Sequence, residues 1–237
     1  MDINPNKTVL LRITRKKVPR FHSYILHNHP ILEVESYKYL GVTLTNKLTW
    51  STHIADICSS AVKKLWFIKR KLRNSPVSTR ITAYKACVRS RLEYAAAVWD
   101  PHNKKDIAQL ERVQRKAVRF IYGKYRRIDS PTALIRKSNL QFLAIRRKVT
   151  RLVLLHNYMS GNLKADLPDC VKLASTRRTR HVHEQSLAPI FARTSGFKNS
   201  FFPNTVAEWN GLPSGLCKSR NFEKELKNLL YGSQYLV

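Results

Sequence analysis

Cationic side chains recur at helical spacing near the middle of the chain. Lys105, Arg112, Lys116 and Arg119 are separated by seven, four and three residues, which places them along one side of a helix. Such a row can hold the phosphates of a nucleic-acid backbone, or it can be an ordinary solvated helix face. The two preceding predicted helices also have a large excess of Lys and Arg over acidic residues, so the sequence favours contact with a nucleic-acid backbone.

Side chains that could catalyse a reaction are few and scattered. Two-metal phosphoryl transfer needs carboxylates that converge on one site, and the sequence has no Asp-Asp, Asp-x-Asp or Glu-x-x-His pattern. P-loops and nucleophilic serine elbows are also absent from the sequence. Cys170, His181, His183 and Cys217 match no common zinc-finger spacing, so buried thiols and exposed imidazoles are favoured over a zinc site. The residues alone predict no complete active site, no metal site and no cofactor in this chain.

The charge balance of the chain points to a polyanionic partner. The sequence has 237 residues, with 44 Lys and Arg against 15 Asp and Glu, which gives a formal net charge of +29. A hydrophobic fraction of 43% is enough for a core and excludes a wholly disordered chain. Because a charge of this size is self-repulsive in a compact protein, a polyanion would stabilise it. Nucleic acid is the expected partner, and an anionic membrane surface is the alternative.

Sequence features of exported and membrane-spanning proteins are missing. The four cysteines form no Cys-x-x-Cys pair, which favours a reducing compartment. The N-terminal residues lack the order of charged, apolar and cleavage regions found in a signal peptide. No apolar stretch approaches the roughly 18 residues of a membrane span. We therefore expect an intracellular protein of the nucleus or cytoplasm that is not secreted.

The first fifty residues predict short strands. Their apolar, β-branched and aromatic runs cover residues 8–14, 24–26, 31–34 and 37–44. In the last run, Tyr37, Tyr39, Gly41 and Thr43 alternate with the intervening residues. This alternation predicts a single strand with a glycine in its middle, which another backbone approaches closely.

From Trp50 onward the apolar residues follow the period of a helix, interrupted by capping residues and prolines. The helices expected from this pattern cover about 51–72, 75–100, 103–123, a short stretch after Ser130-Pro131, 141–160, 203–209 and a final stretch capped by Ser219. Residues 162–200 should be mostly loop, and they include the basic tract Arg177–His181.

Six runs of sequence occur in an order typical of one protein family. They are Asn4–Thr8, Tyr37–Val42, Leu48–Ile54, Leu92–Pro101, Leu110–Ala117, and Ser200–Pro203 with Trp209–Pro213. Together they resemble the reverse transcriptases of non-LTR (LINE-type) retrotransposons, with jockey-like elements as the nearest relatives. The runs correspond to the family's Asn-x-x-Lys-Thr palm segment, Tyr-Leu-Gly primer-grip strand, thumb entry, Leu-Glu-Tyr-x-x-x-x-Trp-x-Pro signature, Leu-Glu-x-x-Gln-Arg-x-Ala helix and Phe-Phe-Pro…Trp-Asn-x-Leu-Pro tail. The resemblance covers nearly the whole chain.

The resemblance implies roles for residues near the N-terminus. Lys7 matches a palm lysine that acts near the phosphates of the incoming nucleotide as a proton donor or electrostatic stabiliser. Tyr39, Leu40 and Gly41 match the primer-grip turn, where a small residue lets the backbone approach the primer terminus. The structural alternatives are a lysine at a strand edge and a plain buried hairpin.

The resemblance also implies what lies outside the chain. Glu93, Tyr94 and Trp99 are interpreted as structural, with Trp99 packed between helices and Glu93 in an internal ion pair. The family's catalytic aspartates, which bind Mg²⁺ in the full-length enzyme, would precede Met1. We therefore expect a C-terminal part of such an enzyme that is inactive as a polymerase by itself.

The expected fold class is α+β. A small antiparallel N-terminal sheet, interpreted as a palm remnant, should cover residues 1–49. A mostly α-helical thumb bundle should cover 50–160, and a loop-rich helical tail should cover 161–237. The resemblance implies that the chain grips RNA, DNA or an RNA–DNA hybrid through its phosphates, alongside upstream polymerase segments.

Two other functions remain open. One is a stand-alone basic nucleic-acid-binding protein derived from a transposon. The other is a peripheral membrane protein that uses basic amphipathic helices. Membrane binding requires exposed apolar helix faces, whereas the apolar faces here are typical of the core of a helix bundle.

Overall fold

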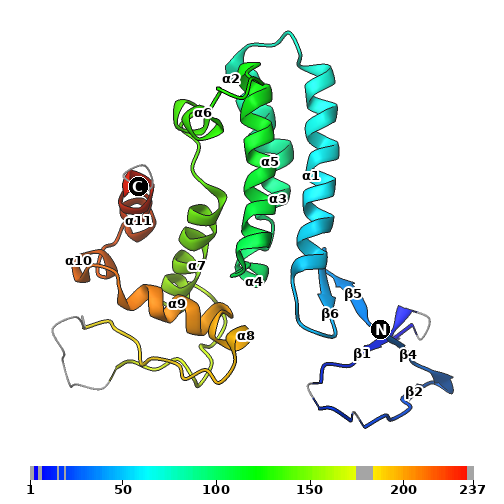
Figure 1. Ribbon diagram of the computed structural model, residues 1–237. Helices are drawn as coiled ribbons and strands as arrows, with labels where there is room; N and C mark the ends of the chain where they lie inside the picture. Colours follow the sequence, from blue (N-terminus) through cyan, green and yellow to red (C-terminus); the bar gives the residue numbers. More distant parts are fainter. Residues whose placement is uncertain (1–2, 5–6, 15, 19, 175–183, 234–237) are drawn as a thin grey trace. The chain divides into compact units, whose positions relative to one another are not determined.

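The computed structural model describes the chain except residues 1–2, 5–6, 15, 19, 175–183 and 234–237 (Figure 1). The chain divides into two compact units, Met1–Ser60 and Ala61–Val237. The first unit holds the short strands and the start of the first helix, and the second unit holds the other helices, which confirms the predicted α+β class. The basic tract Arg177–His181 lies outside the described residues.

The strands of the first unit form three two-stranded pairs. The pairs are β1 (Val9–Leu11) with β4 (Leu32–Val34), β2 (Ile25–Leu26) with β3 (His29–Pro30), and β5 (Ser36–Tyr39) with β6 (Val42–Thr45). The second and third pairs are antiparallel, as expected. The first pair is parallel, with Val9 opposite Leu32, and Arg12 beside it forms a 2.8 Å ion pair with Glu33.

The predicted single strand over 37–44 is wrong, because the chain folds back there as the β5–β6 hairpin. Tyr39 lies opposite Val42, and the two residues between them have positive φ values, 45° at Leu40 and 84° at Gly41. A two-residue turn with two positive φ angles matches the twist of the flanking strands. Side chains alternate on both strands of a hairpin, so the period-two pattern continues through the turn and does not show where the chain reverses.

One histidine joins the hairpin to the first helix, α1 (Ser51–Lys71). His53 is buried, and its Nδ1 accepts a 3.2 Å hydrogen bond from the backbone N–H of Thr43. Burial lowers the pKa of His53. A neutral imidazole is the form that can accept this bond, so the connection of β6 to α1 relies on an uncharged ring.

The predicted helix over 75–100 is interrupted twice. It consists of α2 (Val77–Tyr84), a π-helical segment η2 (Lys85–Arg89), α3 (Ser90–Glu93) and α4 (Ala96–Trp99). The break before α4 falls at Ala95, whose φ is 52°. The predicted core residues Tyr84, Val88, Leu92 and Trp99 are nevertheless fully buried. The apolar period survives both interruptions, so it cannot reveal them.

The remaining helices are α5 (Lys104–Tyr122), α6 (Pro131–Lys137), α7 (Leu143–Met159), α8 (Ser195–Lys198), α9 (Phe201–Asn210), α10 (Ser214–Cys217) and α11 (Phe222–Ser233). Of these, α7, α9, α10 and α11 build a second core towards the C-terminus, together with residues of the loops between them. α7 packs against α4 and α5 and also against α9 and α11 (Figure 1). None of the described helices is long and apolar enough to cross a membrane.

Candidate nucleic-acid interface

Helix α5 is fixed at both ends by the capping residues that the sequence predicts. At its start, the Asn103 side chain accepts a 2.9 Å hydrogen bond from the backbone N–H of Asp106. At its end, Gly123 adopts the left-handed conformation with φ 64°. The inward face of α5 is buried through Leu110, Val113, Gln114, Ala117, Val118, Phe120 and Ile121.

The outward face of α5 has only cationic charges. We define the α5 cationic face by its exposed members, which are Lys104, Lys105, Arg112, Arg115 and Lys116. The two carboxylates of this helix, Asp106 and Glu111, are both buried. The exposed charges on this face of α5 are therefore all positive, which favours an anionic partner.

Glu111 stabilises the start of the neighbouring helix. Its Oε1 accepts a 2.9 Å hydrogen bond from the backbone N–H of Ala144, in the first turn of α7. The N-cap residue of α7, Phe142, offers no side-chain cap of its own. Burial raises the pKa of Glu111, against the lowering effect of the Ala144 hydrogen bond. Glu111 is therefore a cap supplied by another helix, at some cost of desolvation.

Changing Glu111 to Gln should alter how stability depends on pH. The folded-state pKa of Glu111 is raised above its ordinary value of 4.5, so the folded protein binds the carboxyl proton more tightly than the unfolded chain does. The protonated carboxyl group therefore contributes its full stabilisation below pH 4.5. It is lost as pH rises through the folded-state pKa. The free energy of unfolding of the wild type, minus that of Glu111→Gln, should fall between about pH 4 and about pH 7. Urea denaturation at about pH 4 and at about pH 7 measures the free energy of unfolding of both proteins. If the wild type gains stability relative to Glu111→Gln as pH rises, the pKa of Glu111 is not raised by folding.

Arg119 differs from the other three cations of the predicted row. It is half-buried, and its Nη1 donates to the carbonyl oxygen of Tyr125 at 3.1 Å. Its Nη2 donates to the carbonyl oxygen of Asp129 at 3.3 Å. The Asp129 carboxylate in turn accepts a 2.9 Å hydrogen bond from the backbone N–H of Arg126. Arg119 therefore holds the loop after α5, whereas Lys105, Arg112 and Lys116 are exposed as predicted.

The other predicted site residues belong to the first unit. Lys7 is exposed just before β1, and Tyr39 and Gly41 are exposed at the β5–β6 turn.

No metal site is found in the part of the chain that the structure describes. Groups of three or more His, Cys, Asp or Glu side chains placed to hold a metal ion do not occur there. The Mg²⁺ that the resemblance implies therefore has no matching ligand set among these residues. Cys170 is exposed and Cys217 is buried, and burial raises the pKa of Cys217 to about 11. His181 and His183 lie outside the described residues.

A buried ion network explains the end of the Leu92–Pro101 motif. The Asp100 carboxylate accepts hydrogen bonds from Arg147 Nε at 2.6 Å and from Arg151 Nε at 2.8 Å, both on α7. The two arginine side chains are only 1% and 5% exposed. Arg151 also pairs with Glu208 of α9 at 2.9 Å. Asp100 and Glu208 thus supply the two negative charges that balance Arg147 and Arg151 inside the second unit.

Glu93 and Trp99, two other residues of this motif, also have structural roles. Arg146 Nη2 donates to Glu93 Oε2 at 2.9 Å, which confirms the predicted internal ion pair of Glu93. Trp99 is fully buried, and its indole N–H donates to the carbonyl oxygen of Tyr94 at 2.8 Å. These contacts fix the α3–α4 break against α7.

The tail motif anchors a preceding loop segment. The Trp209 indole N–H donates to the carbonyl oxygen of Gln185 at 2.9 Å. The Asn210 side chain accepts from the N–H of Leu187 and donates to its carbonyl oxygen, both at 2.8 Å. The side chains of Trp209 and Asn210 therefore satisfy backbone groups of Gln185 and Leu187 as the backbone of an adjacent strand would.

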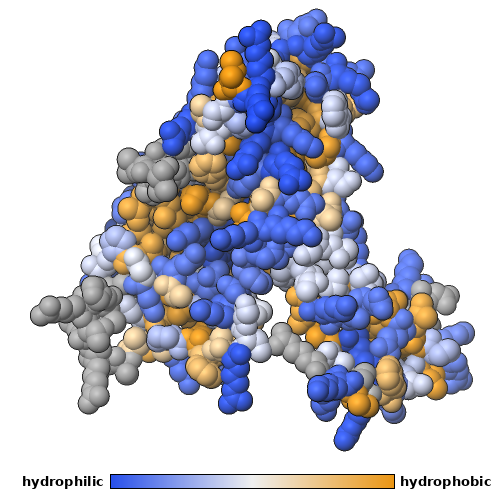
Figure 2. Space-filling view, viewed as in Figure 1, coloured by the Kyte–Doolittle hydropathy of each residue, from blue (hydrophilic) through white to orange (hydrophobic). Residues whose placement is uncertain are grey.

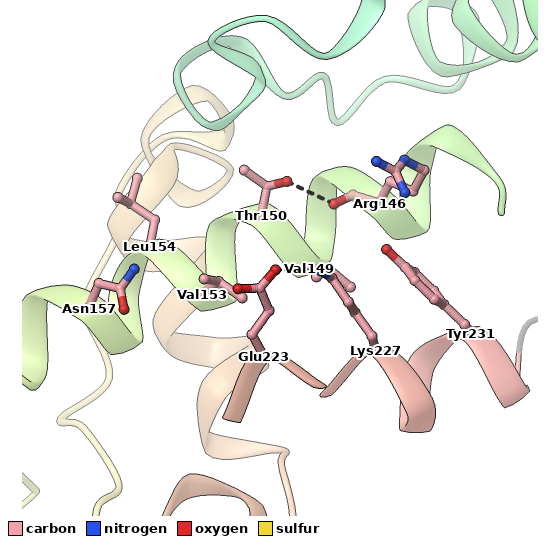
Figure 3. A pocket seen from close by; sticks show the side chains of 9 residues that line it. All are labelled: Arg146, Val149, Thr150, Val153, Leu154, Asn157, Glu223, Lys227 and Tyr231. Atoms are coloured by element: carbon pink, nitrogen blue, oxygen red, sulfur yellow. Dashed lines mark hydrogen bonds and ion pairs between the residues drawn. The ribbon is translucent and has the colours of Figure 1, made fainter. Parts of the chain in front are cut away.

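A groove of about 330 Å³ lies between α7 and α11 (Figure 3). The residues lining it are Arg146, Val149, Thr150, Val153, Leu154, Asn157, Glu223, Lys227 and Tyr231. Its charges are mixed, because Arg146 is paired with Glu93 and Lys227 with Glu223. The groove therefore lacks the excess of positive charge that a phosphate would require.

Comparison with known proteins found two similar sequences. The chain is 27% identical over 129 residues to the probable RNA-directed DNA polymerase from transposon X-element of Drosophila melanogaster, which covers 52% of the chain and 14% of the relative. It is 30% identical over 102 residues to the RNA-directed DNA polymerase from mobile element jockey of the same organism, which covers 41% of the chain and 11% of the relative. No protein-family model matches the chain. No solved structure matches it significantly either. The predicted resemblance to jockey-like reverse transcriptases is thus confirmed, and the chain spans about one seventh or less of the relatives' length.

Proposed function

We propose that this chain, similar to a small part of two jockey-like RNA-directed DNA polymerases, is a thumb-like part of such an enzyme. In this role it grips the duplex of template and primer. The ligand is an RNA–DNA hybrid or another nucleic-acid duplex, held by its phosphates. Polymerisation, with its Mg²⁺, belongs to other polymerase segments in this proposal.

The α5 cationic face is the observation that supports this proposal. Its five cations are exposed, the two carboxylates of the helix are buried, and the helix is fixed at both ends. At 1.5 Å per residue, Lys105 and Lys116 are about 16 Å apart along α5, the axial length of about five base pairs of B-form duplex. A rigid row of this length can contact successive phosphates. Such contacts fix the position of a duplex without reading its sequence, which suits a polymerase that copies any template.

The N-terminal residues are assigned by the resemblance. In this proposal Lys7 acts near the phosphates of the incoming nucleotide, and Tyr39 and Gly41 contact the primer. Their exposure in the first unit is compatible with such contacts.

Replacing Arg112 and Lys116 with Gln should weaken duplex and hybrid binding at every sequence. Each neutralised phosphate contributes about −0.9 to the slope of log affinity against log salt on duplex DNA. The double variant should therefore have a slope shallower by up to about two. Fluorescence anisotropy with a labelled RNA–DNA hybrid at several salt concentrations measures both quantities.

A charge-matched control separates local contact from the general effect of net charge. Lys198 on α8 and Lys224 on α11 are also exposed, and replacing both with Gln removes the same total charge. This control should leave the slope nearly unchanged. If Arg112→Gln/Lys116→Gln is folded by circular dichroism and retains the wild-type slope, α5 is not the binding surface.

A further inference from the structure

A second surface in the helical unit combines aromatic rings with cations. The Lys69 ammonium, near the end of α1, lies 4.8 Å from the ring centroid of Trp66 and 4.8 Å from that of Tyr125. Both distances are within the range of a cation–π interaction. Trp66 is 56% exposed and Tyr125 is 52% exposed. One ammonium thus holds two aromatic side chains that remain open to solvent.

The loop that presents Tyr125 is built by specific hydrogen bonds. The Arg119 side chain donates to the carbonyl oxygens of Tyr125 and Asp129. The backbone carbonyl oxygen of Arg119 accepts a 3.0 Å hydrogen bond from the backbone N–H of Lys124. The Asp129 carboxylate accepts from the N–H of Arg126. Tyr125 is therefore held by its backbone on one side and by Lys69 at its ring, and Arg119 is its positioning residue.

The surroundings of the two rings are strongly cationic. Residues 61–75 contain six Lys and Arg and no Asp or Glu, and residues 119–130 contain four Lys and Arg and one Asp. That Asp is Asp129, whose carboxylate is already bonded within the loop. Figure 2 shows that hydrophilic side chains cover most of the end of the helical unit where α2 and α6 lie. The exposed cations on these two segments are Lys63, Lys64, Arg70, Lys71, Arg73, Lys124, Arg126 and Arg127.

We propose that Trp66 and Tyr125 form a stacking platform for the unpaired bases of a single-stranded nucleic acid. The surrounding Lys and Arg side chains hold its phosphates. Aromatic side chains interleaved with cations are the usual means of binding single strands without sequence preference. A duplex cannot use this platform, because its base faces are stacked on one another. We define these two rings with Lys69 as the single-strand platform.

This inference rests on the proposed function only in taking nucleic acid as the ligand. The surface differs from the α5 cationic face, and the ligand is an unpaired strand instead of a duplex. Anionic lipid is the competing ligand, because aromatic and cationic side chains also bind membrane surfaces. It is disfavoured because membrane-binding helices need a broad exposed apolar face, whereas Leu65 and Ile68 of α1 are buried.

The test uses the full chain and three probes: a fluorescent 20-nucleotide oligothymidine, a 20-base-pair duplex, and vesicles containing phosphatidylserine. Trp66→Ala/Tyr125→Ala should bind oligothymidine at least about tenfold more weakly, because each stacked base is worth about 1–3 kcal/mol. Its duplex affinity should stay within about twofold of the wild type. Trp66→Phe should keep most of the single-strand affinity, since the ring remains, but it should abolish the quenching of tryptophan fluorescence that a stacked base causes.

Each outcome has a definite meaning. Unchanged oligothymidine binding by the folded Trp66→Ala/Tyr125→Ala variant would overturn the proposal. A loss of vesicle binding with oligothymidine binding retained would overturn it in favour of lipid. Arg112→Gln/Lys116→Gln provides the cross-check, because it should weaken duplex binding and leave fluorescence quenching by oligothymidine in place. If that variant binds duplex normally while the aromatic variant loses the single strand, the duplex proposal fails and the single-strand platform stands.

Discussion

Replacing Asp100 with Ala is expected to lower the free energy of unfolding by about 3–5 kcal/mol. The carboxylate is the shared partner of Arg147 and Arg151, whose side chains are 1% and 5% exposed. Without it, Arg147 loses its carboxylate partner inside the second unit, and Arg151 keeps only its pair with Glu208. Uncompensated buried charge is among the most destabilising changes that a single substitution can cause. Urea denaturation followed by circular dichroism measures the loss.

Two further variants make this result interpretable. Asp100→Asn keeps the shape of the side chain and removes only the charge, so most of the loss should persist. Asp169→Ala removes an exposed carboxylate of the same unit and should change stability by less than about 0.5 kcal/mol. If both Asp100 variants lose less than about 1 kcal/mol in free energy of unfolding, Arg147 and Arg151 do not need the Asp100 carboxylate as a partner.

Replacing Trp209 with Ala should cost a similar amount, about 3–5 kcal/mol, through a different mechanism. The indole is 1% exposed and packs against Phe222 with ring centroids 5.4 Å apart. It also donates the hydrogen bond that holds the carbonyl oxygen of Gln185. The substitution leaves a cavity in the second core and releases the loop segment before α8. Thermal or urea unfolding measures the first effect, and increased hydrogen exchange at residues 184–188 reports the second.

The chain offers a control of the same residue type. Trp66→Ala removes an indole that is 56% exposed, and it should change stability by no more than about 1 kcal/mol, the worth of its contact with Lys69. Equal losses for the two tryptophan variants would contradict the assignment of Trp209 to the core. Normal exchange at residues 184–188 in Trp209→Ala would contradict its role in anchoring the loop.

The helices that could be predicted from the sequence are those with local start and stop residues. Asn103 and Gly123 define α5, and Ser130 defines α6, because capping depends on residues within one turn of the helix end. Apolar periodicity could not predict the β5–β6 turn or the break at Ala95, and only the family resemblance implied a turn at residues 39–41. Neither changes the periodicity of the apolar residues. A contact from far along the chain lies beside the break, the 2.9 Å hydrogen bond from Arg146 Nη2 to Glu93.

The candidate interface could be predicted in part for the same reason. Helical spacing is local, so it correctly placed Lys105, Arg112 and Lys116 on an exposed face of α5. It missed Lys104 and Arg115, which share that face, and it could not show that Arg119 donates to the loop after the helix.

The ion network at Asp100 was beyond prediction from sequence. Its arginine partners lie 47 and 51 residues away in sequence, and only the folded chain brings them together.

Duplex binding by α5 is tested most directly by lysine acetylation, measured by mass spectrometry with and without a saturating RNA–DNA hybrid. Lys105 and Lys116 should lose most of their reactivity in the complex, because phosphates would cover their ammonium groups. Lys198 and Lys224, which are exposed on α8 and α11, should react equally in both states. Undiminished acetylation of Lys105 and Lys116 with the hybrid bound would contradict the proposed function and place the duplex on another surface.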